Sequence, residues 1–297
     1  MSEKIDILRR KLLIMLQEYT GIEPLRINLE QGQLEKILFD AKTHRFAISP
    51  YLLTKLDFSN VSFKGVIIED IDFTNLKNVY INPQELYSKS VSGSILSGVT
   101  FTGSFDNVLV FATDFAGSHN AVIDPQKVQY KVFCHSKFRD VTFIGNFDGV
   151  GLRHVDFTGS HNVTINPATI NGKELMECKF YGVTFTGAFD DVVVMESDFT
   201  GSHNAFINPV TIKLQSLYRC KLSDVTFTES LDEANFREAD FTGSHNGKIS
   251  FAKLAKKYKE DKEYKDNIKG LEYLEITDIK ETKADDILLK LQRKLKG

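Results

Sequence analysis

The sequence predicts an all-β solenoid, a chain that coils into stacked layers of short strands. Two observations predict this fold. The motif Gly-Ser-His-Asn occurs four times, and its histidines are spaced by 42 residues in every interval. Within that period a large apolar residue recurs at nearly every fifth position. A five-residue step fits neither an α-helix, with roughly 3.6 residues per turn, nor the simple alternation of a strand.

One period shows the five-residue step clearly. Its apolar anchors are Ile165, Ile170, Leu175, Phe180, Phe185, Phe189, Val194 and Phe199, followed by Ile207 at the start of the next period. Every step is five residues long except one of four after Phe185 and one of eight after Phe199. This spacing fits a chain that turns a square corner every five residues and keeps one side chain per side inside. Eight anchors then make two coils per period.

These segments resemble the pentapeptide-repeat family, whose consensus is Ala, Asp or Asn, Leu or Phe, Ser or Thr, and often Gly. Residues 239–243 (ADFTG) match all five positions, and residues 234–238 (ANFRE) match the first three. The resemblance covers roughly residues 48–252 and implies a right-handed quadrilateral β-helix with four pentapeptides per coil. Counting anchors from Ile48 gives about ten coils, which makes a rod on the order of 45 to 50 Å long at ~4.8 Å per layer.

The two ends of the chain follow other patterns. Residues 1–47 are predicted to form an N-terminal helical cap, because 4–19 have helical apolar spacing and 33–42 form a second short helical pattern. Residues 253–297 form a charged C-terminal extension with a helix to about residue 267, a strand-like or irregular stretch over 271–279, and an amphipathic helix over 285–295. The last helix either packs on the final coil or mediates dimerisation, so a monomer or a homodimer is expected. Caps are expected because open solenoid ends expose unpaired strand edges.

Several protein classes are disfavoured by the sequence. The apolar run Leu12 to Leu16 is too short and too closely flanked by charges for a secretory or membrane-spanning segment, so a cytoplasmic protein with no membrane partner is expected. Cys134, Cys178 and Cys220 are expected to be reduced thiols rather than disulfides. The sequence contains no phosphate-binding loop, dinucleotide fingerprint or metal-spaced Cys or His cluster. It therefore predicts no enzymatic activity, no cofactor and no metal site.

The repeated Gly-Ser-His-Asn loops are the first candidate for a functional surface. Their histidines are His119, His161, His203 and His245. Asp156, Ser160 and His161 supply the residue types of a hydrolytic triad. Repetition argues against catalysis or metal binding, because copies two coils apart are about 9 to 10 Å apart, whereas zinc lies about 2 Å from its ligands. The loops are interpreted as corner loops of turn-favouring residues, with a histidine ridge for binding as the alternative.

Aspartates form two ladders with the same 42-residue period. The first ladder, just before an anchor, comprises Asp72, Asp114, Asp156, Asp198 and Asp240. The second ladder, just after an anchor, comprises Asp106, Asp148, Asp190 and Asp232. Both ladders are predicted to point outward and to flank the same face. They are interpreted as solvated, turn-favouring positions, and the alternative is that they mimic phosphate groups.

The charge of the repeat distinguishes two functional hypotheses. Residues 56–250 carry 23 acidic and 15 basic side chains, a net charge of −8. The family resemblance implies one specific kind of partner, because some members resemble duplex DNA in shape and charge and bind gyrase. Duplex DNA carries a charge every ~1.7 Å, so a rod of this length would need about 28 negative charges to match it. The net charge of −8 falls well short of that number. We therefore expect a non-enzymatic scaffold for a protein partner, with no direct binding of nucleic acid. The alternative is a partial DNA mimic that binds a type II topoisomerase or another DNA-binding protein.

Overall fold

The computed structural model describes residues 39–40, 45–46, 63–65, 67–74, 76–260 and 267–278. The helices predicted over 4–19 and 285–295 lie outside these residues. At Phe39–Asp40, inside the segment predicted as helical over 33–42, the chain forms strand β1, which pairs antiparallel with β2 (Arg45–Phe46). The helix prediction is wrong at these two residues, because a helix this short is marginal unless tertiary packing supports it.

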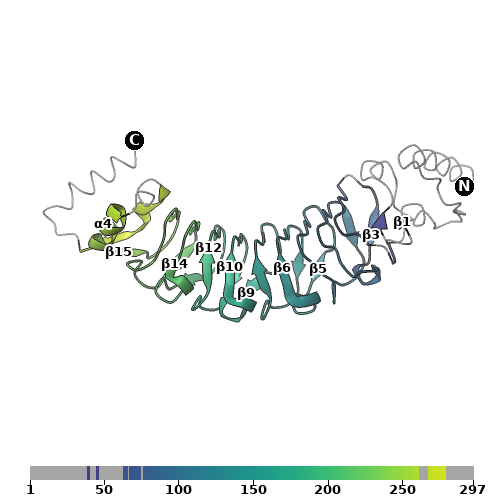
Figure 1. Cartoon of the computed structure of the whole chain (residues 1–297), viewed down its shortest axis with the longest axis horizontal. Coiled ribbons are helices and arrows are strands. Elements are labelled where there is room, and N and C mark those ends of the chain that lie inside the picture. Colours follow the sequence, from purple (N-terminus) through teal and green to yellow (C-terminus); the bar gives the residue numbers. More distant parts are fainter. Residues whose placement is uncertain are drawn as a thin grey trace, which may run out of the picture. The chain divides into compact units, whose positions relative to one another are not determined.

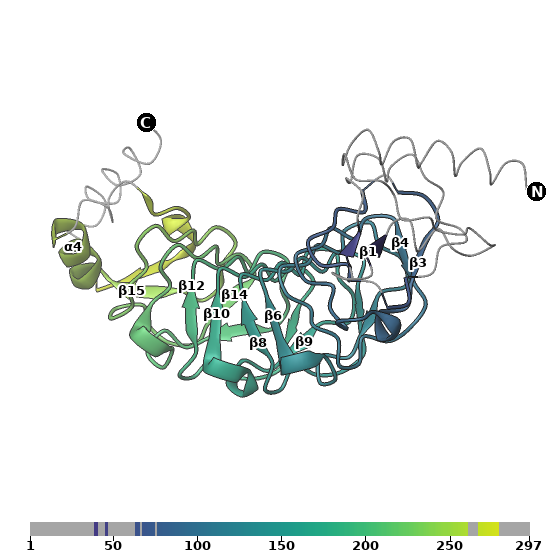
Figure 2. The same cartoon turned by 45° about the vertical axis from the view of Figure 1, so that its right-hand side comes forward.

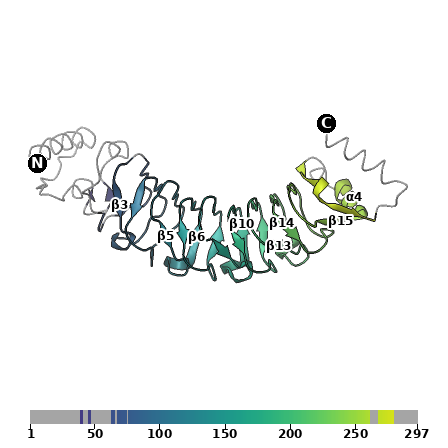
Figure 3. The same cartoon turned by 180° about the vertical axis from the view of Figure 1, so that it is seen from behind.

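The chain divides into two units, and unit 1 comprises residues 1–132 and 136–144. Besides β1 and β2, its strands and 3-10 turns are β3 (Val79–Ile81), η1 (Pro83–Glu85), β4 (Val99–Phe101), β5 (Val122–Ile123), η2 (Gln129–Lys131) and β7 (Thr142–Phe143). Strand β3 pairs in parallel with β4, and β5 pairs in parallel with β7. Strands β3 and β5 are labelled in Figures 1 and 3. Unit 1 thus contains the same arrangement twice. In each case two short parallel strands are paired, and a long connecting segment of the chain joins them.

Unit 2 comprises residues 133–135 and 145–297. Its repeated strands are the last two residues of β6 (Val132–Cys134), β8 (Gly151–Arg153), β9 (Thr164–Ile165), β10 (Glu174–Met176), β11 (Thr184–Phe185), β12 (Val193–Met195), β13 (Ala205–Ile207) and β14 (Val225–Phe227). Its 3-10 turns are η3 (Pro167–Thr169), η4 (Asn171–Lys173) and η5 (Lys213–Gln215). Strands β12, β10, β8 and β6 form a four-stranded sheet in that order, whereas β9 with β11 and β13 with β14 form separate two-stranded sheets (Figure 2). One face is therefore a continuous sheet and another is divided into pairs.

The pairing register repeats at nearly constant intervals along the chain. Glu174 lies beside Val193 in the β10–β12 pair, and Thr164 lies beside Thr184 in the β9–β11 pair. In the β8–β10 pair, Leu152 lies beside Leu175. In all three pairs, the paired residues are therefore separated in the sequence by about half of the 42-residue period. The molecule is a β-rich repeat architecture with parallel layers, as the spacing of the anchors predicts.

The predicted anchors form the core of unit 2. All eight anchors from Ile165 to Phe199 are buried, each no more than 3% exposed. Phe180 is fully buried, and its ring centre lies 6.4 Å from that of Phe157, 5.2 Å from that of Phe185 and 5.0 Å from that of Phe199. Burying one such side chain contributes about 1.5–3 kcal/mol. Stacked phenylalanines therefore hold successive layers together.

The C-terminal extension adds one more strand to unit 2. After β15 (Lys248–Ser250) the chain forms helix α4 (Phe251–Glu260), then η6 (Leu271–Tyr273) and β16 (Glu275–Thr277). Strand β16 falls within the stretch 271–279 that the sequence predicts to be strand-like or irregular, and it pairs in parallel with β15. Helix α4 lies beside β15 (Figures 1 and 3) and buries Leu254. The extension thereby covers the edge that β15 would otherwise expose.

Candidate binding surfaces

The first aspartate ladder stabilises turns. In each of its five members, carboxylate Oδ1 accepts a hydrogen bond from the backbone N–H two residues later, at donor–acceptor distances of 2.8 to 3.0 Å. An aspartate that accepts such a bond closes a local turn, which is why this residue type recurs where the chain changes direction. Asp72 is exposed, and the other four members are half-buried rather than fully solvated.

Lysines of the next layer pair with this ladder. In unit 1, Lys137 Nζ lies 2.8 Å from Asp114 Oδ2. In unit 2, Lys179 lies 2.8 Å from Asp156 and Lys221 lies 2.8 Å from Asp198. Cross-strand bridges in unit 2 run through 156, 179, 198, 221, 240 and 269, so that aspartate and lysine alternate along the column. A column of alternating sign is locally neutral, and opposite charges on adjacent strands stabilise the pairing.

The lysine contacts govern the acidity of two carboxyl groups. Burial raises the pKa of Asp156 and Asp198, but hydrogen bonds from the paired lysine and from the threonine two residues later outweigh it. Both pKa values therefore lie below the ordinary value. A lowered pKa stabilises the fold above the unfolded-state pKa of about 3.9, and this stabilisation is lost as pH falls through the folded-state pKa.

We expect Asp198→Asn to remove this acid-dependent stabilisation while keeping the turn, because an asparagine oxygen still accepts the Thr200 N–H bond. The variant should be about 0.5–1 kcal/mol less stable than wild type at pH 7, and the difference should shrink as the pH falls below the unfolded-state pKa of about 3.9. Urea unfolding at pH 7, 5 and 3 measures this. The matched control is Asp72→Asn, because Asp72 makes the same turn bond but lies beside Ile95 in place of a lysine. Equal effects of the two substitutions at pH 7 would show that the lysine contact contributes nothing.

The second aspartate ladder lies closer to the surface. Asp148 and Asp190 are exposed, and each accepts a hydrogen bond from a threonine hydroxyl of the next layer, Thr169 or Thr211. Asp106 and Asp232 are half-buried, and Asp232 Oδ1 accepts the Ser250 backbone N–H at 2.7 Å. Among the described residues, no ion pair with lysine or arginine is found at positions 106, 190 and 232. These three carboxylates therefore present more uncompensated negative charge than the lysine-paired members of the first ladder.

The Gly-Ser-His-Asn loops turn through left-handed backbone, and in three of them the histidine forms a parallel bridge to a threonine of a neighbouring layer. Their four asparagines have φ values of 57 to 60° and their glycines of 72 to 79°. Glycine and asparagine tolerate this left-handed backbone best, which explains both residue types. The four histidines are exposed. Ser160 Oγ donates to the Phe157 carbonyl at 2.7 Å and Asp156 pairs with Lys179, so the three triad residue types do not form the hydrogen bonds that activate a serine.

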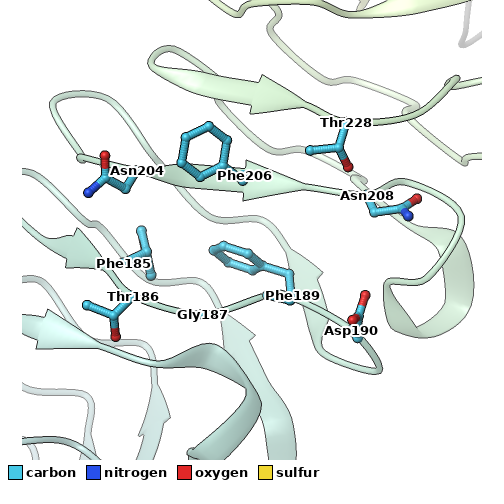
Figure 4. Close-up of a pocket in the computed structure, with 10 residues that line it drawn as sticks. Phe185, Thr186, Gly187, Phe189, Asp190, Asn204, Phe206, Asn208 and Thr228 are labelled. Carbon is cyan, nitrogen blue, oxygen red and sulfur yellow. The ribbon is translucent and has the colours of Figure 1, made fainter.

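A hollow beside β13 in unit 2 was not predicted from the sequence (Figure 4). It has a volume of about 710 Å³. Its lining includes Phe206, Asn204, Asn208, Thr186, Thr228 and Asp190. Past the bridge between Thr184 and His203, no backbone hydrogen bond joins residues 186–190 to residues 204–208, all of which the structure describes. The inserted loop thus interrupts the ladder and opens the hollow.

Unit 1 contains the equivalent hollow. Its volume is about 340 Å³, and every residue that lines it stands two periods before a residue that lines the hollow of unit 2. Val122 occupies the position of Phe206, and Ile144 that of Thr228. The recurrence of an outward apolar residue at Tyr80, Val122 and Phe206 is the sequence signal that could have located this surface.

A column of ionisable side chains lies along one corner of unit 2. The rings of His135 and His154 stack with their centres 4.3 Å apart, and His154 Nδ1 lies 2.8 Å from Glu177 Oε2. Further along, Arg219 Nε lies 2.7 Å from Glu238 Oε2. All five residues have φ values of 53 to 58°. The sequence predicts His135 to be a solvated residue outside the loops, and its stacking on His154 was missed because the two belong to different layers. No group of three or more His, Cys, Asp or Glu side chains placed to hold a metal ion occurs in the described part of the chain.

The three cysteines are free thiols, of which Cys178 and Cys220 are buried and Cys134 is half-buried. Burial raises the pKa of Cys178 and of Cys220 to about 12, and it also raises the pKa of Cys134. Because the thiolate is the reactive form, we expect Ellman's reagent at pH 8 to modify Cys134 first and the other two only after unfolding in guanidinium. The Cys134→Ser variant should show no reaction in the native state. Rapid modification of two or more thiols in native wild-type protein would contradict the assigned burial.

No protein-family model matches the chain, and no match was found among the curated proteins. In the described part of the chain, no helix combines the length and apolar character needed to cross a membrane. The surfaces described above are therefore the basis for assigning a function.

Proposed function

We propose that the chain belongs to the pentapeptide-repeat family and that its layers close into a right-handed quadrilateral β-helix of about ten coils. Three observations support this proposal. The anchor residues of one full period are buried, strands pair in parallel at offsets close to half of that period, and left-handed residues recur at equivalent places in successive layers. A square coil of four pentapeptides accounts for all three.

We propose further that the protein is a non-enzymatic scaffold that binds a protein partner. The observation that carries this proposal is Leu214, which is 71% exposed and has a φ of 62°. A left-handed backbone costs a leucine about 1–2 kcal/mol, whereas Gly172 occupies the equivalent position one period earlier. Tyr130 in unit 1 stands in the same kind of turn and is 74% exposed. Exposed apolar side chains on strained backbone stabilise the fold little, and strained backbone clusters at functional sites.

The alternative, a partial DNA mimic, receives less support from the charges. Lysines pair with Asp114, Asp156 and Asp198, and a paired carboxylate projects little field beyond the surface. The second aspartate ladder, at 106, 148, 190 and 232, and the exposed histidines are the surfaces on which a mimic would depend. A supercoiling assay tests it directly. A DNA mimic should compete with DNA for gyrase or relieve quinolone inhibition, and the scaffold should do neither.

Affinity capture from source-cell lysate, quantified by mass spectrometry, tests the scaffold proposal. The test variant replaces both Tyr130 and Leu214 with glycine, and we expect it to remain folded while capturing about tenfold less partner, on the order expected for loss of two contact residues. The matched control is Val210→Ala, because Val210 is also exposed and Ala168 is its equivalent one period earlier. Capture of no protein above a tag-only control, or the same capture by the double variant, would overturn the proposal.

A further inference from the structure

We propose that the hollow beside β13 binds a neutral oligosaccharide. The first observation is a flat apolar platform. Phe206 is the outward-facing residue of β13, Asn204 and Asn208 flank this strand, and all three line the hollow (Figure 4). Phe206 is 51% exposed and lines the hollow. An exposed aromatic ring presents a broad apolar face on which the C–H face of a sugar ring can stack, with both surfaces leaving water.

The second observation is the set of uncharged polar groups around this ring. The side chains of Asn204, Thr186 and Thr228 make no hydrogen bond within the part of the chain that the structure describes. Asn208 Oδ1 accepts a hydrogen bond from the Val210 backbone N–H at 2.9 Å, which leaves the side-chain N–H groups of Asn208 to donate. Hydroxyls and amides both donate and accept, and sugar hydroxyls do the same. On several sides of the Phe206 ring, the lining of the hollow therefore offers the donors and acceptors that sugar hydroxyls need.

Charge in the hollow narrows the class of ligand. Among the described residues that line it there is no lysine, arginine or histidine, and the single ionisable side chain is that of Asp190. Asp190 Oδ1 accepts the Thr211 hydroxyl, which leaves Oδ2 to accept from other donors. Phosphates and nucleic acids need cationic partners, and an acidic ligand would be repelled by Asp190. A neutral polyhydroxylated ligand needs no cationic partner and is not repelled by Asp190, because its hydroxyls can donate hydrogen bonds to a carboxylate.

The repeat shows that the aromatic platform is particular to this site. The position of Phe206 is occupied by Thr164 one period earlier and by Val122 two periods earlier. Neither side chain offers an aromatic face, and the hollow at Val122 has about 340 Å³ against about 710 Å³. Because the same fold accommodates a threonine at the equivalent place, Phe206→Thr is a change that the protein should tolerate.

Titration with three soluble probes, cellohexaose, chitohexaose and mannohexaose, tests the proposal by calorimetry and by chemical shifts of the full-length protein. We expect at least one probe to bind wild type and to shift the amides of residues 186–190 and 204–208. Phe206→Thr should weaken that binding by about tenfold or more, which is within the range for loss of a central aromatic contact. Phe206→Tyr keeps the aromatic face and should bind within about threefold of wild type.

The matched control is Tyr181→Ser, which removes an exposed aromatic ring outside the hollow and introduces the residue found at the equivalent positions Ser97 and Ser223. It should leave probe binding unchanged. Absence of binding by all three probes, equal binding by Phe206→Thr, or an equal loss in Tyr181→Ser would each overturn the proposal. The site is independent of the turn at Leu214, so failure of the partner-capture experiment would leave this result unaffected.

Discussion

Phe180→Ala is expected to lower the free energy of unfolding by about 3–5 kcal/mol. Phe180 is fully buried, and its ring centre lies 5.0 to 6.4 Å from those of Phe157, Phe185 and Phe199. Alanine would remove contacts to the layers on both sides at once and leave a cavity that neighbouring backbone cannot close. Urea unfolding followed by circular dichroism measures the loss, since the protein has no tryptophan for fluorescence.

The repeat supplies the control for this substitution. Leu222 occupies the equivalent buried position one period later, so Phe180→Leu places a residue that the same architecture already accepts. We expect Phe180→Leu to cost about 1 kcal/mol. If the alanine and leucine variants lost equal stability, the size of the stacked ring would not be what holds these layers together.

Gly270→Ala is expected to release the C-terminal strand and to cost about 2–4 kcal/mol. Gly270 has a φ of 71°, and an added Cβ would lie 2.2 Å from the backbone nitrogen of Thr242 and 2.6 Å from the carbonyl carbon of Phe241. Backbone atoms of a packed layer cannot move aside as a flexible side chain can. Faster hydrogen exchange at β16, residues 275–277, would report the release directly.

A second glycine separates the steric effect from the conformational one. Gly182 has a φ of 78°, but an added Cβ there would meet no atom within 4 Å. Gly182→Ala should therefore show only the cost of a left-handed alanine, about 1–2 kcal/mol, and should leave exchange at β16 unchanged. Equal losses in the two variants would mean that the close approach at Gly270 is not what positions the extension.

The anchors of the buried core were predictable because a large apolar residue recurs at nearly every fifth position, and this periodicity is written directly in the sequence. Turn positions such as Asp198 were predictable for the same reason. The partner of Asp198 was not, although Lys221 repeats with the same period. Recognising that pair requires the register between layers, which brings the two side chains together from successive layers. The spacing of anchors gives the length of a layer but not this alignment.

The hollow beside β13 shows another limit of the sequence. The eight-residue step after Phe199 reveals an inserted loop, and the sequence predicts a corner there. Only the structure shows that the insertion ends the pairing between residues 186–190 and 204–208, and so exposes Phe206. Strand β16 illustrates the same limit, because it pairs with β15 across the intervening helix α4 and lies outside the repeat.

The alternation of aspartate and lysine along unit 2 bears on how the chain avoids misfolding. Repeats this similar could stack out of order, with one layer skipped during folding. A slip by one layer would bring Asp198 next to Asp156 or Asp240, and like charges on adjacent strands are unfavourable. A slip by two layers would restore an aspartate–lysine match, so charge alone does not oppose it. Kinetically trapped species of this chain are therefore expected to be displaced by whole repeat periods.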